Sequence, residues 1–209
     1  MISEASRLKD KLVLFGAGNI GRSFIGQIFS RSGYEVVFVD VIKEIVNLLN
    51  ERRKYSIEIK DVHSETISVE NVRAVHANDL KKVALEIATG DILATAVGVN
   101  NLPSIYRNIA YGLLERWKLN KGPIDIIICE NLRNSSSVFR EGLSRHLPRD
   151  YPLDSLVGLV ETSIGKMVPL MTEEQRKVDP LLVFAEAYNV LTVGKSGFRN
   201  KPPEVEGLE

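Results

Sequence analysis

The chain has 209 residues, enough for one domain with a sizeable core. It carries 27 basic and 27 acidic side chains, so no net charge attracts nucleic acid or an anionic membrane, and we expect neither partner. A single cysteine, a polar start and apolar runs of strand length predict a cytoplasmic protein without disulfides or membrane spans, and three scattered histidines predict no bound metal.

The first predicted element is a buried strand, LVLF at 12–15, that runs directly into a glycine-rich turn. In the G-x-G-x-x-G pattern, the first glycine permits a tight turn, the second lets a pyrophosphate approach the backbone and the third lets helix and strand pack closely. A helix over 23–32 follows, and its N-terminus offers N–H groups to phosphates. The candidate cofactor-binding residues of the turn are Phe15, Gly16, Ala17, Gly18, Asn19, Ile20 and Gly21.

A second strand, at 35–39, ends in Asp40. Asp40 stands near the spacing at which dinucleotide folds place an acid on the adenosine ribose hydroxyls, so we expect it to bind the cofactor. Such an acid repels a 2′-phosphate and favours NAD over NADP, unless a nearby arginine reverses the preference. The alternative is that Asp40 only caps the following helix.

Residues 41–52 predict an amphipathic helix whose apolar face holds Val41, Ile45, Leu48 and Leu49. Two alternating segments, at 55–59 and 65–69, then predict an antiparallel hairpin around 60–64. This hairpin interrupts the alternation of strands and helices, so we interpret it as a flap inserted beside the main sheet. Residues 72–75 predict a third parallel strand.

A helix carrying Leu80, Val83, Leu85 and Ile87 is expected next, between a cap at Asn78 or Asp79 and a stop at Gly90. The following strand ends in small residues, which leave room for a ligand at the carboxyl edge of a sheet. An ordinary tight turn explains them as well. The candidate cofactor-binding residues of this strand end are Thr95, Ala96, Val97 and Gly98.

A long helix over 103–117 leads to another core strand, at 124–129, which delivers Glu130 and Asn131 to the same edge. We expect both to bind the cofactor, with capping of a helix over 135–147 as the alternative. Cys129 is expected to be a small buried residue rather than a nucleophile.

Beyond Pro148 the chain predicts strands at 156–162 and 181–193, a polar loop at 171–177 and a linker at 201–209. The predicted fold is therefore α/β, a doubly wound Rossmann-type sheet with an inserted antiparallel hairpin and a mixed-sheet C-terminal extension. We expect one NAD-binding domain over 1–200, with its core near 11–150 and the extension at 151–200.

Four segments together resemble the mannitol dehydrogenase family of polyol-specific long-chain dehydrogenases. They are FGAGNIGRSFIG at 15–26, VD at 39–40, TAVG at 95–98 and CEN at 129–131. The resemblance extends from about 11 to 199 and includes the hairpin and DPL at 179–181.

The resemblance implies an NAD-dependent oxidoreductase that interconverts a polyol phosphate and a keto-sugar phosphate, with mannitol 1-phosphate and fructose 6-phosphate expected first. It also implies a catalytic role for Asn131, whose amide would contact the reacting oxygen. The family's lysine base lies in a helical C-terminal domain, which we expect as a partner beyond 209. Lys195 and Asn200 match part of that motif, but Pro203 stands in place of its histidine.

A second departure concerns the family sequence Val-Asp-Arg-Ile, which is Ile164-Gly165-Lys166-Met167 here. The missing aspartate leaves a sugar-acid reductase of the fructuronate or tagaturonate type as an alternative. A non-catalytic NAD-binding module is the alternative from another class.

Overall fold

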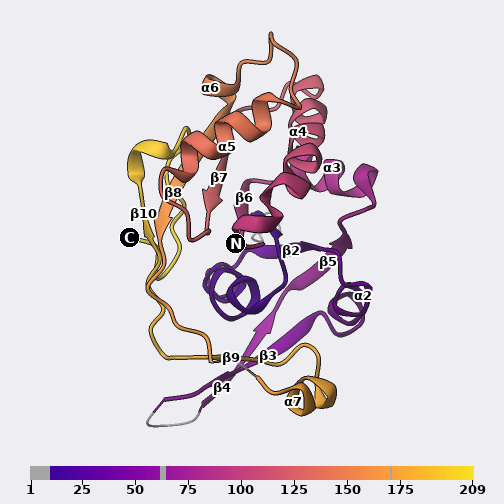
Figure 1. Cartoon of the computed structure of the whole chain (residues 1–209), viewed down its shortest axis with the longest axis vertical. Helices are drawn as coiled ribbons and strands as arrows, with labels where there is room; N and C mark the ends of the chain where they lie inside the picture. The colour runs from indigo at the N-terminus through magenta and orange to yellow at the C-terminus, as the bar shows by residue number, and fades with distance from the viewer. Residues whose placement is uncertain (1–9, 62–64, 170) are drawn as a thin grey trace, which may run out of the picture.

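The computed structural model describes residues 10–61, 65–169 and 171–209. A seven-stranded sheet in the order β10-β8-β7-β6-β1-β2-β5 forms its centre (Figure 1). Only β10 runs antiparallel to its neighbour, and the order on the two sides of β1 is that of doubly wound dinucleotide folds. The strands are β1 (Lys11–Phe15), β2 (Glu35–Asp40), β5 (Val72–His76), β6 (Ile92–Thr95), β7 (Ile124–Ile128), β8 (Val157–Ser163) and β10 (Thr192–Val193).

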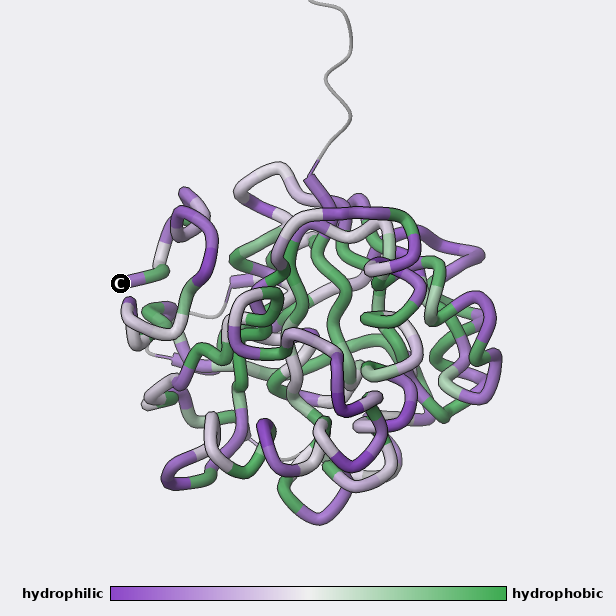
Figure 2. Tube along the Cα trace, turned by 90° about the horizontal axis from the view of Figure 1, so that it is seen from above, coloured by the Kyte–Doolittle hydropathy of each residue, from purple (hydrophilic) through white to green (hydrophobic). Residues whose placement is uncertain are grey.

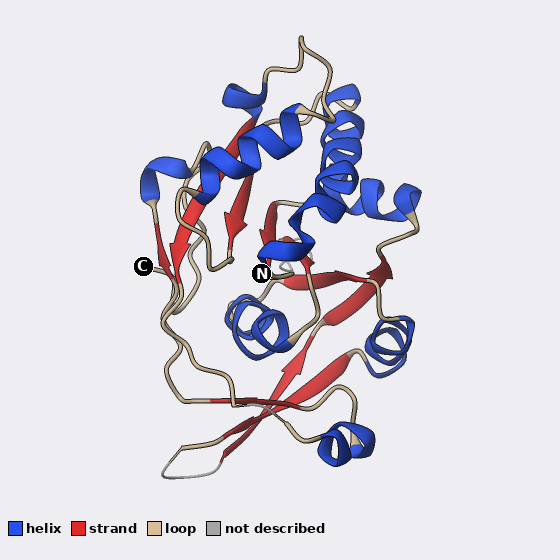
Figure 3. Ribbon diagram, in the orientation of Figure 1, coloured by secondary structure: helices blue, strands red, loops and turns tan. Residues whose placement is uncertain are grey.

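Alternate side chains of β1 enter two cores on opposite faces of the sheet. Leu12 and Leu14 pack with residues of η1, α1 and α2, whereas Val13 and Phe15 pack with residues of α3, α4 and α5. Figure 3 shows the helices packed around the central sheet. Burial on both faces explains the uninterrupted apolar run of this strand. The helices are η1 (Gly21–Gly26, a π-helical turn), α1 (Gln27–Arg31), α2 (Lys43–Arg52), α3 (Leu80–Thr89), η2 (Val99–Asn101), α4 (Leu102–Lys118), α5 (Ser135–Ser144), α6 (Leu153–Leu156), α7 (Glu173–Val178) and η3 (Lys195–Gly197).

A second, three-stranded sheet has the order β4-β3-β9, with β3 at Lys54–Ile59, β4 at Glu65–Glu70 and β9 at Val183–Ala185. The predicted hairpin is confirmed, although residues 62–64 of its turn lie outside the described part. β9 pairs in parallel with β3, which joins the flap to the C-terminal extension. The predicted fold class is confirmed, and Figure 2 shows the hydrophobic segments gathered in the interior.

Two predicted helix faces are wrong in detail. Val41 precedes α2 and is exposed, because the helix begins only at Lys43 and Val46 packs in the core instead. Leu85 is exposed on α3, since it lies off the helical stripe through Val83 and Ile87.

The predicted loop at 171–177 is also wrong, because α7 occupies much of it. Thr172 accepts a hydrogen bond from the Gln175 N–H (3.2 Å), and Gln175 Oε1 accepts one from the Thr172 N–H (2.8 Å). This capping box starts a helix in a polar segment. The long strand predicted over 181–193 reduces to β9 and β10, which belong to different sheets.

Residues 201–209, expected to be a linker, lie against the segment that precedes β10. The Leu191 N–H donates to the Gly207 carbonyl (2.6 Å), and the Glu209 N–H donates to the Leu191 carbonyl (3.0 Å). Val205 is buried against the first core. A role for this segment between domains stays a prediction.

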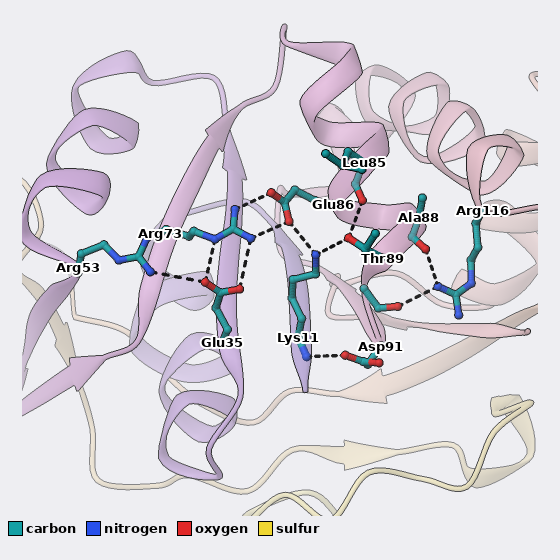
Figure 4. A network of polar contacts seen from close by, with 11 residues as sticks. Lys11, Glu35, Arg53, Arg73, Leu85, Glu86, Ala88, Thr89, Asp91 and Arg116 are labelled. Carbon is teal, nitrogen blue, oxygen red and sulfur yellow. Dashed lines mark hydrogen bonds and ion pairs between the residues drawn. The ribbon is translucent and has the colours of Figure 1, made fainter. Parts of the chain in front are cut away.

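A network of charged side chains connects the amino ends of the strands (Figure 4). Arg73 on β5 donates to both Glu35 on β2 and Glu86 on α3, and Lys11 on β1 also contacts Glu86 (2.9 Å). Burial would raise the pKa of Glu86, but the hydrogen bonds from Arg73 and Lys11 hold it below its ordinary value. Within the described ranges, no helix combines the length and apolar character needed to cross a bilayer.

Candidate functional site

The glycine turn lies at the carboxyl end of β1, where the chain enters η1. Gly16 has φ +98°, and its N–H donates to the Val39 carbonyl (2.9 Å). A Cβ at Gly21 would lie 2.0 Å from the Gly16 carbonyl oxygen, so only glycine fits there. A Cβ at Gly18 would meet no atom within 4 Å. Gly18 is therefore dispensable for packing and open to a ligand.

Asp40 connects the end of β2 to this turn. Its Oδ2 accepts a hydrogen bond from the Ala17 N–H (2.7 Å), and its Oδ1 accepts one from the Ile42 N–H (2.9 Å). Asp40 is not the cap of α2, because the N-cap residue is Ile42 and no side chain caps it. Each carboxylate oxygen keeps a further acceptor position for a ligand hydroxyl.

A cavity of about 530 Å³ opens beside Asp40, which we name the β1–β2 cavity. Val41 and Ile42 give it exposed apolar surface, and Arg107 on α4 lines it as well. Sequence reasoning missed this part of the site, since it placed Val41 in a helix. The predicted cofactor-binding residues that line the cavity are Phe15, Gly16, Gly18, Asp40, Ala96 and Val97.

Glu130 holds the turn after β6. Its Oε1 accepts a hydrogen bond from the Val97 N–H and its Oε2 one from the Gly98 N–H, both at 2.9 Å. Burial raises the pKa of Glu130, and these hydrogen bonds oppose the rise. Glu130 therefore does not cap α5, because both of its oxygens support the neighbouring strand end.

A second cavity, of about 660 Å³, lies across the ends of β7 and β8 and is named here the β7–β8 cavity. Asn131 lines it as an exposed side chain, together with Glu130, Gly98 and Ile20. Glu161 also lines this cavity, and its Oε1 accepts hydrogen bonds from the Ser136 N–H (2.9 Å) and hydroxyl (2.8 Å). Through these bonds Glu161, rather than Glu130, supports the start of α5.

The remaining predicted residues lie next to these cavities without lining them. Ala17, Gly21 and Thr95 are buried, and Asn19 is half-buried at the start of the helix. Cys129 is buried as predicted, and burial raises the pKa of its thiol, which keeps the thiol protonated and unreactive.

Two buried cations near the site were not predicted. Arg22 donates to the Pro180 carbonyl (2.9 Å), and burial lowers the pKa of its guanidinium. Lys166 lines the β7–β8 cavity, and burial lowers its pKa to about 8 although Glu186 opposes the shift. The available signal was a lone lysine within the otherwise apolar segment IGKMV. The structure groups no three His, Cys, Asp or Glu side chains as metal ligands in the part of the chain it describes.

The fold and the two cavities define a Rossmann-type nucleotide domain. The chain belongs to the mannitol dehydrogenase Rossmann domain family, whose profile matches residues 10–207. The resemblance given by the sequence motifs is therefore confirmed.

Curated relatives agree with this assignment. Mannitol-1-phosphate 5-dehydrogenase of Brevibacillus brevis is 37% identical over 198 residues, which are 94% of this chain and 50% of the relative. The chain thus spans about half the length of the curated relatives it matches.

Solved structures share the fold at low identity. A D-sorbitol dehydrogenase in substrate-free form has a TM-score of 0.75 at 16% identity, over 89% of this chain and 50% of that one. Mannitol 2-dehydrogenase of Pseudomonas fluorescens, in a ternary complex with NAD and D-mannitol, has a TM-score of 0.72 at 13% identity, over 88% and 49%.

Proposed function

We propose that this chain is the NAD-binding half of a dehydrogenase that interconverts mannitol 1-phosphate and fructose 6-phosphate. The observation that carries the proposal is the 37% identity with a mannitol-1-phosphate 5-dehydrogenase across nearly the whole chain. The open surface at Gly18 and the free acceptor positions of Asp40 fit a dinucleotide.

Different residues of the two cavities would bind different parts of the cofactor. Asp40 and the apolar surface of Val41 and Ile42 would hold the adenosine end, and the turn at 16–21 would hold the pyrophosphate. The strand end at 95–98, fixed by Glu130, would hold the nicotinamide end. When bound, NAD⁺ accepts a hydride from the alcohol carbon.

Asn131 would contact the reacting oxygen. Its side chain is exposed in the β7–β8 cavity, and an amide N–H stabilises an oxygen on which negative charge develops. The described residues that line this cavity include Lys166 and no histidine. Because the family resemblance places the lysine base in a helical C-terminal domain, we propose that the base which takes the hydroxyl proton comes from a further domain that closes over the cavity.

An activity assay tests the proposal. The 209-residue chain should bind NADH without oxidising mannitol 1-phosphate, whereas the complete product of its gene should oxidise it and produce NADH. Turnover by the purified 209-residue chain would contradict the assignment of the base to another domain. A reading frame that stops near Glu209 would favour a non-catalytic NAD-binding module.

A sugar-acid reductase is the second candidate, on one specific observation. Gly165 stands where the family resemblance places an aspartate, and a Cβ there would reach only the Tyr188 ring, at 3.7 Å. Position 165 therefore carries no carboxylate that would repel an acidic substrate. Parallel assays with fructuronate, tagaturonate and mannitol 1-phosphate distinguish the two candidates.

A further inference from the structure

Lys166 is a buried cation on the wall of the β7–β8 cavity. Only 6% of its surface is exposed, and it lies three residues after the end of β8. Its Nζ donates to Asn189 Oδ1 (3.1 Å) and lies 5.1 Å from the centroid of the Phe24 ring. Both contacts are with uncharged groups, so the ammonium has no counter-ion in them.

The nearby carboxylates are engaged elsewhere. Glu186 accepts a hydrogen bond from the Met167 N–H, and Glu130 and Glu161 accept from the backbone at 97–98 and from Ser136. Glu186 attracts the ammonium, but none of the three forms a direct ion pair with Lys166 among the residues that the structure describes. A buried ammonium without a counter-ion is costly, and Lys166 keeps two N–H donors beyond the one directed at Asn189.

A second cation faces the same cavity. Arg133 lines it with an exposed side chain and makes no ion pair within the described ranges. Lysine and arginine bind phosphate and carboxylate groups through charge-assisted hydrogen bonds. Lys166 and Arg133 therefore offer an anion one buried and one exposed contact, in the cavity where Asn131 lies.

We propose that Lys166 binds the anionic substituent of the substrate, a phosphate monoester or a carboxylate, with Arg133 as a second contact at the rim. This inference rests on the proposed function, because it assumes that the substrate occupies the β7–β8 cavity. Both candidate substrate classes carry such a group, so Lys166 would distinguish them from a neutral polyol.

Steady-state kinetics of the complete gene product test the proposal, with mannitol 1-phosphate, fructuronate and neutral mannitol compared. Lys166→Met should lower kcat/KM for the anionic substrate about 10- to 100-fold, mainly through KM. It should change kcat/KM for mannitol by less than about 3-fold, and Lys166→Arg should recover part of the loss. The anionic substrate whose kcat/KM falls most in Lys166→Met shows whether the natural substituent is a phosphate or a carboxylate.

The matched control is Lys118→Met, because Lys118 is an exposed lysine on α4. This variant should change neither kcat nor KM for any of the substrates. NADH affinity should be the same in all variants. An equal loss for charged and neutral substrates would assign Lys166 a structural role and overturn the proposal. A loss in kcat alone, with KM unchanged, would overturn it as well.

Calorimetry on the 209-residue chain separates this proposal from the proposed function. Inorganic phosphate is titrated in the presence of NADH into the wild type and Lys166→Met. If no substrate turns over, the proposed function fails, while phosphate binding that is lost in the variant still supports the anion site. The proposed anion site would be contradicted if the wild type did not bind phosphate, or if the wild type and Lys166→Met bound it equally.

Discussion

The amino and carboxyl edges of the seven-stranded sheet, where its strands begin and end, differ in whether their charged side chains form ion pairs. At the amino edge, Arg73, Glu35, Glu86 and Lys11 form a network in which every charge has an opposite partner. At the carboxyl edge, the direct contacts described for Lys166 Nζ are with the uncharged Asn189 side chain and the Phe24 ring, and Gly18 faces open space. The amino edge is built for stability, whereas the carboxyl edge keeps its donors and its space for a ligand.

The largest expected effect is a loss of stability on substitution of Gly21, which the same substitution at Gly18 in the same turn should not cause. Gly21→Ala should lower the free energy of unfolding by about 4 kcal/mol or prevent folding, because its Cβ would overlap the Gly16 carbonyl. Gly18→Ala should leave stability nearly unchanged and weaken NADH binding, because only a ligand occupies that space. Urea unfolding and NADH titration measure the two quantities.

Gly122→Ala is the matched control, since a Cβ there also meets no atom within 4 Å. It should change neither stability nor NADH affinity. A Gly18→Ala protein that binds NADH like the wild type would remove Gly18 from the site.

The next effect belongs to the amino edge. Arg73→Met should cost about 3 kcal/mol of unfolding free energy, because it leaves the carboxylates of Glu35 and Glu86 without this partner. NADH affinity should not change. Lys118→Met breaks an exposed ion pair with Glu115 and should cost less than about 0.5 kcal/mol. A large loss of NADH affinity in Arg73→Met would contradict the division between the two edges.

A smaller effect tests Glu130. Glu130→Gln should cost about 2 kcal/mol, because one of the Val97 and Gly98 N–H groups would face the amide NH₂ instead of an acceptor. NADH affinity should fall with it, since the strand end at 95–98 loses its support. Thermal unfolding and NADH titration of the same variant check both. Unchanged stability would show that these two hydrogen bonds contribute little.

The smallest effect concerns the burial of Lys166. Burial lowers its pKa to about 8, so below pH 8 the ammonium is charged in both states and the full cost of burial is present. Stability should therefore rise as pH increases from 8 toward 10.5. Lys166→Met should be more stable than the wild type by about 1 kcal/mol at pH 7, and the gain should shrink above pH 8. If the stability difference between Lys166→Met and the wild type did not vary with pH, it would not arise from burial of the ammonium.

The central fold was predictable because its signals are local and repeated. Continuous apolar strands, the glycine turn and the acid at Asp40 occur in one order that fits a single topology. The C-terminal extension was harder, because the partners of Leu191 and Val183 lie in distant segments and no local pattern names them. α7 was missed although its capping box is readable in TEEQ.

The sequence predicted which strand ends form the site, but not the role of each side chain there. Sequence position suggested that Glu130 contacts a ligand, whereas the structure directs both of its oxygens to backbone N–H groups. The same limit applies to Lys166, since its burial and its lack of an ion pair within the described residues are properties of the folded chain. The assignment of the remaining site residues to the cofactor stays a prediction.

Titration of NADH into the 209-residue chain tests the central claim most directly, with NADPH and Asp40→Ala measured alongside. The account predicts saturable NADH binding, weaker NADPH binding despite Arg107 in the same cavity, and a loss of roughly 10-fold or more in NADH affinity for Asp40→Ala. Equal affinity of the variant and the wild type for NADH, or preference for NADPH, would contradict it.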